Sequence, residues 1–313
     1  MEFRIPVGTW IDGFFDWLED SFSWLFEALR QLFIWMFDAV DWVFATPPAL
    51  VVIALVAVAA LLARGWKFAV GATLGLLFIM GVNQWDNAID SLALVLVAAF
   101  LAVVISLPLG IWAARNDTVS KILKPVMDFL QTLPAFVYLV PALGLFRIGV
   151  APGIIATLIF AMAPGVRLTE LGIRGVDKEV VEAGQAFGAH PRRILRQIQI
   201  PLAMPSIMAG INQIIMLSLS MVVIAGLVGA GGLGGDVAQA ISALNVSLGF
   251  EAGLSVVVLA ILLDRFTASF GKGLGLYSRW RRSYVAKKEA DQQARFDAEE
   301  EVARGGRRPV AAH

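Results

Sequence analysis

The chain has 313 residues, of which 58% are hydrophobic, and its 25 basic and 25 acidic side chains give a formal net charge of zero. Only 16% of the residues are charged, against about 25% in a typical soluble domain, which indicates an integral membrane protein. The neutral balance argues against a nucleic-acid binder, and the lack of cysteine excludes disulfides, thiolate chemistry and cysteine-ligated metal sites.

Residues 1–48 predict one or two amphipathic helices that precede the first membrane span. Aromatic and aliphatic residues recur at helical spacing with acidic residues between them, and Pro47 and Pro48 end the segment. Such a helix could lie in the membrane interface, where its acidic character suits the outer side. Packing on the helical bundle as a scaffold is the alternative, and the sequence leaves both interpretations open.

Apolar runs long enough, or nearly long enough, to cross a bilayer follow this extension. We expect an all-α integral membrane protein with about seven transmembrane helices. The predicted spans are approximately residues 49–63, 67–83, 89–113, 126–146, 150–166, 207–228 and 252–270.

Basic residues set the expected orientation of these spans. With the N-terminus outside, the outer segments hold only Arg4, Arg30 and Arg147, and the inner segments hold nearly all other Lys and Arg residues. Cytoplasmic loops carry an excess of Lys and Arg, so we expect the N-terminus outside and the C-terminus in the cytoplasm. This orientation places the polar segment 177–201 on the cytoplasmic side.

Two patterns that could suggest an enzyme are weak. Residues 229–234, GAGGLG, match the G-x-G-x-x-G pattern but follow a predicted membrane helix rather than a strand, so we expect a tight turn or close helix packing. His190 and His313 are the only histidines and have no partner cluster, which argues against a metal site. We therefore expect no catalytic residue and no cofactor on this chain.

Polar residues inside the predicted spans should face protein or a water-filled path rather than lipid. They could form hydrogen bonds between helices, or they could line a translocation path. The candidates for such a path are Tyr138, Asn212, Gln213, Ser218 and Met221.

Two further features lie in or beside the spans. Glu170 and Arg174 are four residues apart and can pair on one helix face. Prolines interrupt the apolar helices, a pattern common where a bundle moves or lines a cavity. These prolines are Pro108, Pro134, Pro141 and Pro164.

The polar segment 177–201 predicts two short helices joined by a turn. Asp177 is the expected N-cap of the first helix, and Gly188 is its expected stop. Pro191 suits the first position of a second helix, which we expect Pro201 and Pro205 to end ahead of the sixth span. The result would be a helical elbow, apolar on one side and charged on the other, suited to docking in a groove of a partner protein.

The spacing within this elbow resembles the EAA loop of ATP-binding-cassette (ABC) importer permeases, E-A-A-x3-G-x9-I-x-L-P. Gly184 stands in place of the second alanine, and Ile200 stands in place of the leucine. The matching residues are Glu182, Ala183, Gly184, Gly188, Ile198, Ile200 and Pro201.

The resemblance extends over roughly residues 85–270. Four stretches look like the membrane subunit of glycine betaine and proline betaine importers of the ProU/Opu type: 131–149, 165–176, 201–234 and 259–266. The implied division is an extracytoplasmic extension (1–48), two accessory transmembrane helices (49–84), a core permease domain with its EAA loop at 177–201 (85–270) and a charged cytoplasmic tail (271–313).

The resemblance implies a homodimeric permease with the type I ABC importer fold in a prokaryotic plasma membrane. Two separate ATPase subunits would bind ATP and Mg²⁺, and a separate binding protein outside would deliver the ligand. In the EAA loop, Glu182, Ala183 and Phe187 would contact the ATPase, and Gly188 would permit the elbow. The other residues assigned to ATPase coupling are Gly184, Arg192, Arg193, Ile198 and Pro201, with anionic lipid as an alternative partner of the two arginines.

Other functions stay open at this point. A permease for another small solute, such as choline, carnitine or methionine, would carry the same loop. A secondary transporter would work without an ATPase, but it would need an ion-coupling carboxylate in mid-membrane, and no predicted span carries one at its centre. A purely structural membrane scaffold is favoured only by the unusual N-terminal extension.

Overall fold

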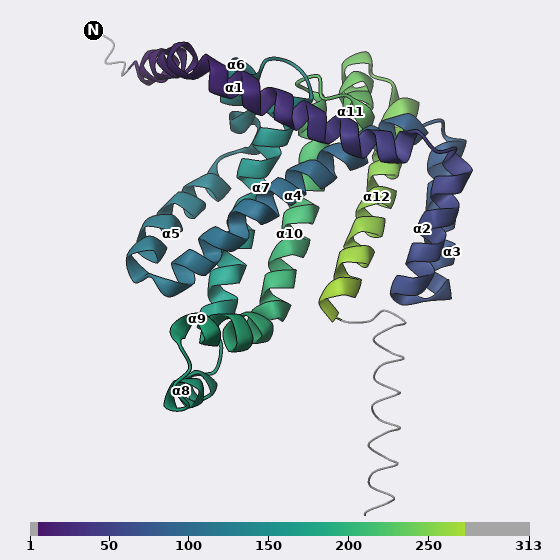
Figure 1. Cartoon of the computed structure of the whole chain (residues 1–313). Helices are drawn as coiled ribbons and strands as arrows, with labels where there is room; N and C mark the ends of the chain where they lie inside the picture. The colour runs from purple at the N-terminus through teal and green to yellow at the C-terminus, as the bar shows by residue number, and fades with distance from the viewer. Residues whose placement is uncertain (1–5, 273–313) are drawn as a thin grey trace, which may run out of the picture.

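The computed structural model describes residues 6–272, and every regular element in that part of the chain is helical (Figure 1). The predicted tail, 271–313, therefore lies almost wholly outside the described residues. The elements are α1 (Val7–Ala45), α2 (Ala49–Arg64), α3 (Trp66–Gly81), α4 (Trp85–Arg115), α5 (Asp117–Thr132), the 3₁₀ turn η1 (Ala135–Tyr138), α6 (Leu139–Phe146), α7 (Val150–Arg174), α8 (Lys178–Ala186), α9 (Pro191–Ile194), the π-helical turn η2 (Leu195–Gln199), α10 (Ile200–Gly226), α11 (Gly232–Ala243) and α12 (Val246–Lys272).

Long apolar helices form the centre of the molecule. Four helical stretches among the described residues are long and apolar enough to cross a membrane: α4, α7, the continuous stretch Pro191–Gly226 and α12. The number rises to six if each of two sharply bent helix pairs is one span, and α3 is apolar but shorter. All seven predicted apolar runs fall on helical segments, although the fourth run is in two pieces.

The fourth run, expected as one span over residues 126–146 with an interruption at Pro134, is broken at that proline. Helix α5 ends at Thr132, and the segment Ala135–Phe146, which contains η1 and α6, leaves at 106° to it. Leu133 and Pro134 are extended, with ψ of 133° and 136°. Proline lacks an N–H and disfavours the helical conformation of the residue before it, which explains the break at this point. By contrast, Pro108 and Pro164 lie inside the uninterrupted helices α4 and α7.

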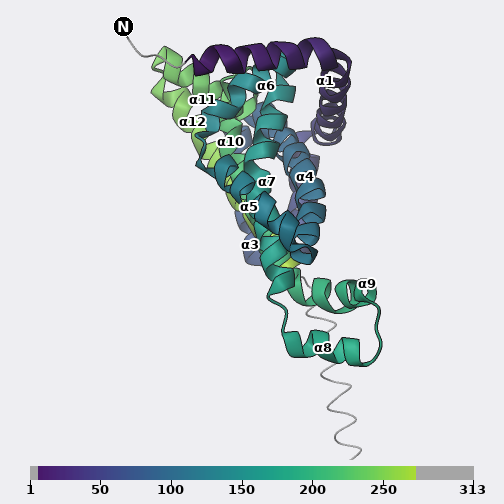
Figure 2. The ribbon, with the colours of Figure 1, turned by 90° about the vertical axis from the view of Figure 1, so that its left-hand side faces the viewer.

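Helix α1 lies across one end of the bundle, and α8 and α9 project from the opposite end (Figures 1 and 2). Its 39 residues form two arms, because Phe22 has non-helical backbone angles (φ −129°, ψ 22°). In the second arm, the rings of Phe26 and Phe33 pack on Phe146 of α6, with centroids 5.7 and 5.9 Å away. The scaffold interpretation therefore holds for this second arm.

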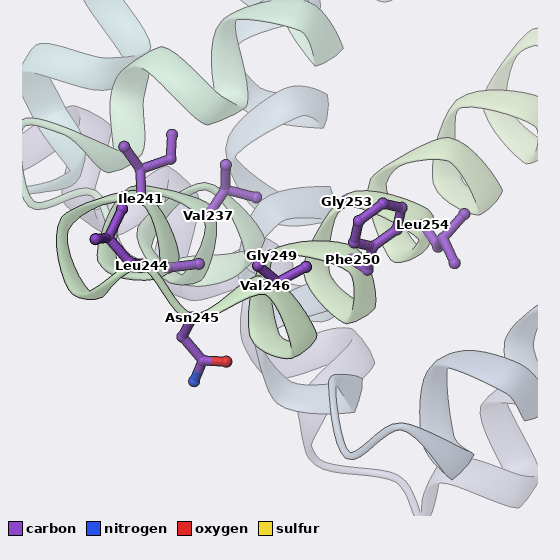
Figure 3. Close-up of a pocket in the computed structure, with 10 residues that line it drawn as sticks. Val237, Ile241, Leu244, Asn245, Val246, Gly249, Phe250, Gly253 and Leu254 are labelled. Carbon is purple, nitrogen blue, oxygen red and sulfur yellow. The ribbon is translucent and has the colours of Figure 1, made fainter.

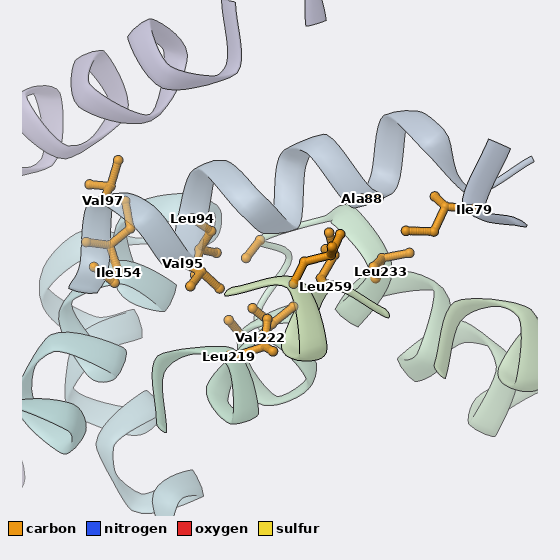
Figure 4. Close-up of a cluster of buried hydrophobic side chains, with 14 of the residues drawn as sticks. Ile79, Ala88, Leu94, Val95, Val97, Ile154, Leu219, Val222, Leu233 and Leu259 are labelled. Atoms are coloured by element: carbon orange, nitrogen blue, oxygen red, sulfur yellow. The ribbon is translucent and has the colours of Figure 1, made fainter. Parts of the chain in front are cut away.

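The main core joins α4, α7, α10, α11 and α12 (Figure 4). Val95 and Leu94 of α4 face Ile154 of α7 and Val222 of α10 within it. Because these contacts connect segments far apart in sequence, they hold the long helices in one body.

The GAGGLG segment forms both a tight turn and a close helix contact, as the sequence predicts. Gly229, Gly231 and Gly232 have φ between +63° and +80°, a region that favours glycine. A Cβ on Gly234 would lie 2.1 Å from the carbonyl oxygen of Val222, so only glycine lets α11 approach α10 this closely. The turn therefore has a structural explanation that needs no bound nucleotide.

We predict that Gly234→Ala destabilises the protein by about 1–3 kcal/mol, the usual cost of overpacking, because the clashing atom belongs to the backbone and cannot rotate away. Gly235→Ala is the matched control, since a Cβ at Gly235 meets no atom within 4 Å. Thermal unfolding in lipid nanodiscs measures both variants. Equal melting temperatures for the two variants would show that the contact does not constrain the fold.

Candidate functional site

The segment 177–201, which we call the coupling loop, begins with the N-cap that the sequence predicts. The Asp177 side chain accepts a hydrogen bond from the backbone N–H of Glu179 at 2.9 Å. This bond satisfies one of the free N–H groups of the first turn of α8.

The turn after α8 is built on Gly188, which has φ of +72°. The N–H of Gly188 donates to the carbonyl oxygen of Gln185 at 2.8 Å, and the N–H of Ala189 donates to that of Gly184 at 3.1 Å. This pair of bonds is the Schellman motif, in which a left-handed glycine ends a helix and reverses the chain. His190 then caps α9, because its Nδ1 accepts from the N–H of Arg192 at 3.3 Å.

The second helix of the loop does not end at Pro201, contrary to the prediction. The helical stretch runs from Pro191 to Gly226 without a break. A π-helical turn precedes the proline, with the N–H of Ile200 bonded to the carbonyl oxygen of Leu195. This turn places Pro201 in the first turn of α10, where the missing N–H is tolerated. The loop is therefore continuous with a membrane-crossing helix.

Helix α8 of the coupling loop projects from the end of the bundle (Figures 1 and 2), and Leu195 of the loop packs on Ile173 and Ile207 of the bundle. No residue of α8 is buried, and the ring of Phe187 is 92% exposed. Gly184 and Ile198 face each other inside the elbow, where a Cβ on Gly184 would lie 2.9 Å from Ile198 Cδ1. The other predicted coupling residues are exposed: Glu182, Ala183, Gly188, Arg192, Arg193 and Pro201.

Two of the predicted path residues lie together, away from the loop. Tyr138 and Met221 are buried in one apolar cluster, and the Tyr138 hydroxyl donates to the carbonyl oxygen of Leu130. Phe160 stands edge-on to the tyrosine ring, with centroids 6.2 Å apart. This cluster connects the broken span α5–α6 to α7 and α10.

The other three predicted path residues have different surroundings. Asn212 binds α12: its Nδ2 donates to Asp264 Oδ1 at 3.3 Å, and its Oδ1 accepts from Thr267 Oγ1 at 2.6 Å. Asn212 thus makes the interhelical hydrogen bonds that were the alternative to lining a path. Gln213 is exposed, and Ser218 Oγ is buried without a hydrogen-bond partner among the described residues. Of the five predicted residues, Tyr138 and Met221 share one buried cluster, and the path itself stays a prediction.

Sequence reasoning found the Glu170–Arg174 pair but missed the network around it. Arg174 Nε lies 3.0 Å from Glu170 Oε1, as the spacing predicts. Arg174 also donates from Nη1 to Asp117 Oδ1 and from Nη2 to the carbonyl oxygen of Ala113, both at 2.7 Å. Ser120 Oγ donates to Glu170 Oε1 at 2.6 Å. Three residues before the coupling loop, Arg174 thus joins α7 to α4 and α5.

An apolar groove lies at the other end of the bundle, between α11 and α12 (Figure 3). It has a volume of about 640 Å³, and its lining includes Ile241, Leu244, Asn245 and Phe250. Phe250 is the single aromatic side chain in this lining, and no acidic side chain contributes to it. A cage for a quaternary ammonium uses several aromatic faces, so this groove has the wrong composition for one.

Comparison with known proteins identifies the family. Residues 106–275 match the family described as "Binding-protein-dependent transport system inner membrane component". The chain belongs to this family. As an inner membrane component of such a transport system, it is a membrane subunit of an ABC transporter.

Relatives match over most of the chain. The glycine betaine/carnitine transport permease protein GbuB of Listeria monocytogenes serotype 1/2a (strain 10403S) is 45% identical, and the match covers 86% of this chain and 96% of that protein. The glycine betaine/proline betaine permease ProW of Escherichia coli (strain K12) is 43% identical, covering 86% and 76%. The glycine betaine permease OpuAB of Bacillus subtilis (strain 168) is also 43% identical, covering 84% and 94%.

A solved structure shows the same fold. The inward-facing MetNI methionine ABC transporter has a chain that superposes with a TM-score of 0.57 at 21% identity, over 61% of this chain and 95% of that one. The architecture is thus that of a type I ABC importer permease.

We predict that Arg174→Gln destabilises the protein by about 1–3 kcal/mol, because Glu170, which is only 7% exposed, then lacks its charged partner. The double variant Arg174→Gln/Glu170→Gln should recover part of this loss, since the buried charge is gone. Denaturant unfolding of the wild type, both single variants and the double variant measures the coupling. Strictly additive losses would contradict the network.

Proposed function

We propose that this chain is the permease subunit of an ABC importer for glycine betaine or related quaternary-ammonium osmoprotectants. The observation that carries the proposal is the length and level of the match to three permeases whose names contain glycine betaine. The name of one of them also contains carnitine, so a related quaternary ammonium is the nearest alternative substrate.

The exposed coupling loop supports docking to a separate ATPase subunit that binds ATP and Mg²⁺. Its outer surface carries the exposed apolar side chains of Phe187 and Val180 and the basic side chains of Arg192 and Arg193. An apolar anchor surrounded by charges is the usual composition of an energetically important contact. Glu182 and Ala183 lie on α8, which ends just before Phe187, and they would enlarge the contact area with the ATPase.

The complete transporter would contain two copies of this chain, two ATPase subunits and a separate binding protein. Alternating access would follow from movement of the coupling loop, which α7 and α10 carry directly. Tyr138, Met221 and Ser218 stay our candidates for the passage, and the buried hydroxyl of Ser218 has no partner among the described residues.

The proposed orientation places the N-terminus outside and the C-terminus in the cytoplasm. The coupling loop then faces the ATPase on the cytoplasmic side, and α1 lies at the outer end. The distribution of Lys and Arg supports the same orientation. The binding protein would approach the end of the bundle where α1, α6 and α11 lie.

The test is uptake of labelled glycine betaine by proteoliposomes that hold this chain, its ATPase and its binding protein. We expect ATP-dependent uptake with the active ATPase and none with a catalytically dead ATPase. Uptake that persists with the dead ATPase would indicate a secondary transporter. If glycine betaine is not taken up but another solute is, in an ATP-dependent manner, the permease role stands and the substrate assignment is wrong.

A further inference from the structure

Five tryptophans of α1 follow a helical repeat. Trp10 and Trp17 lie in the first arm, and Trp24, Trp35 and Trp42 lie in the second. At about 100° per residue, separations of seven or eleven residues place the tryptophans of each arm within roughly 20° of one another. Each is exposed, from 56% for Trp17 to 70% for Trp24. We call these five side chains the tryptophan stripe.

The stripe faces away from the bundle. In the second arm, Phe26, Phe33 and Phe37 pack on the core. Helical geometry places these three phenylalanines about 160–180° around the helix from Trp35, so the tryptophans lie on the opposite face from the packed one. Trp24 also borders a groove that Leu145 and Arg147 line. The bundle therefore does not explain five large exposed aromatic residues in register.

The two flanks of the stripe differ in chemistry. On one flank of Trp35, at about 60–120° around the helix, the acidic residues of the second arm follow one another: Glu27, Asp38 and Asp41. On the other flank, at about 60–80°, stand the exposed aliphatic side chains of Leu25, Leu32 and Val43. The stripe thus lies on the boundary between a hydrophilic and an apolar surface of α1.

The first arm has the same arrangement of acidic and apolar flanks, but its residues are not buried against the bundle. Asp20 lies on the acidic side of Trp10 and Trp17, and the exposed side chains of Ile11 and Phe14 lie on the apolar side. None of residues 8–22 is buried. The apolar surface of this arm must therefore be covered by something outside the described chain.

The position of α1 indicates what covers it. The long helices cross the membrane, and α1 lies transverse to them at the end opposite the coupling loop (Figures 1 and 2). Helix α4 begins beside the end of α1, where Trp85 and Phe44 line one cavity. From Trp85 to Trp112 the axis of this helix is about 40 Å long, enough to cross the hydrocarbon core of a bilayer although the helix runs obliquely (Figure 1). The exposed Trp66 and Trp112 mark the other surface of the bilayer.

We propose that the tryptophan stripe binds the boundary between headgroups and acyl chains in the leaflet opposite the coupling loop. The acidic flank then faces water, the aliphatic flank enters the acyl region, and the indole rings occupy the layer between them. Tryptophan prefers this layer because its ring is apolar and its N–H can donate a hydrogen bond. The stripe holds α1 in the plane of the membrane surface and covers the first arm.

Fluorescence quenching of the full chain in lipid nanodiscs tests this proposal. Subtracting the emission of a variant with all five stripe tryptophans replaced by phenylalanine isolates the signal of the stripe. Lipids brominated near the headgroup end of the acyl chain should quench this signal strongly. Bromines at the end of the acyl chain and aqueous acrylamide should quench it less. The Trp66→Phe/Trp112→Phe variant is the matched control. Subtracting its emission isolates the signal of Trp66 and Trp112, and this signal should depend on the depth of the bromine in the same way as that of the stripe.

Two results would overturn the proposal. Strong acrylamide quenching without an effect of bromolipids would place the stripe in water. Insensitivity to both quenchers would mean that protein covers it, such as a second copy of this chain. A variant that retains only Trp10 and Trp17 of the stripe answers the same question for the first arm alone, and phenylalanine at the exposed positions leaves the packed face of α1 unchanged.

Discussion

The close approach of α7 and α10 is the constraint on which the rest of the structure depends. An added Cβ at Gly165 would lie 2.6 Å from Ile214 Cδ1, and one at Gly172 would lie 2.7 Å from Ser206 Cβ. Gly210 faces Gly165 across the same contact. Small residues let helices in a membrane pack through their backbones, where van der Waals contact replaces the hydrophobic driving force available in water.

This contact has a mechanical consequence, because α7 and α10 are also the two helices that flank the coupling loop. The loop is therefore held at the tip of a closely packed pair, and α10 continues into it without a break through the π-helical turn. Arg174 extends the connection to α4 and α5 at the same end of the bundle. A force applied to α8 would reach four helices through packed backbone and charged hydrogen bonds rather than through a flexible linker.

Local chemistry explains what the sequence could predict. Asp177 and Gly188 were recognisable as a cap and a stop because their bonding partners lie within a few residues. The membrane class and the family resemblance followed from composition and motif spacing. The direction that the chain takes after Pro134 could not be predicted from the sequence. The apolar composition of the run indicates that it lies in lipid, but it does not give the angle between the two helices. The partners of Asn212 lie 52 and 55 residues away on α12, so only the folded structure reveals them.

The same distinction applies to α1. Its helical periodicity was evident, and the sequence left lipid contact and bundle contact as competing interpretations. The structure divides the helix around its circumference: one side packs on α6 and the core, and another side carries the tryptophan stripe. The two interpretations therefore describe different faces of one helix.

The central claim is that the coupling loop inserts into an ATPase subunit. The chain contains no cysteine, so a single introduced cysteine can be labelled without background. Phe187→Cys places the thiol on the loop, and Leu244→Cys, at a residue 87% exposed at the opposite end, is the control. Addition of the ATPase should slow labelling of Phe187→Cys by a membrane-impermeant maleimide and leave Leu244→Cys unchanged. Equal labelling rates at position 187 with and without the ATPase would contradict the account.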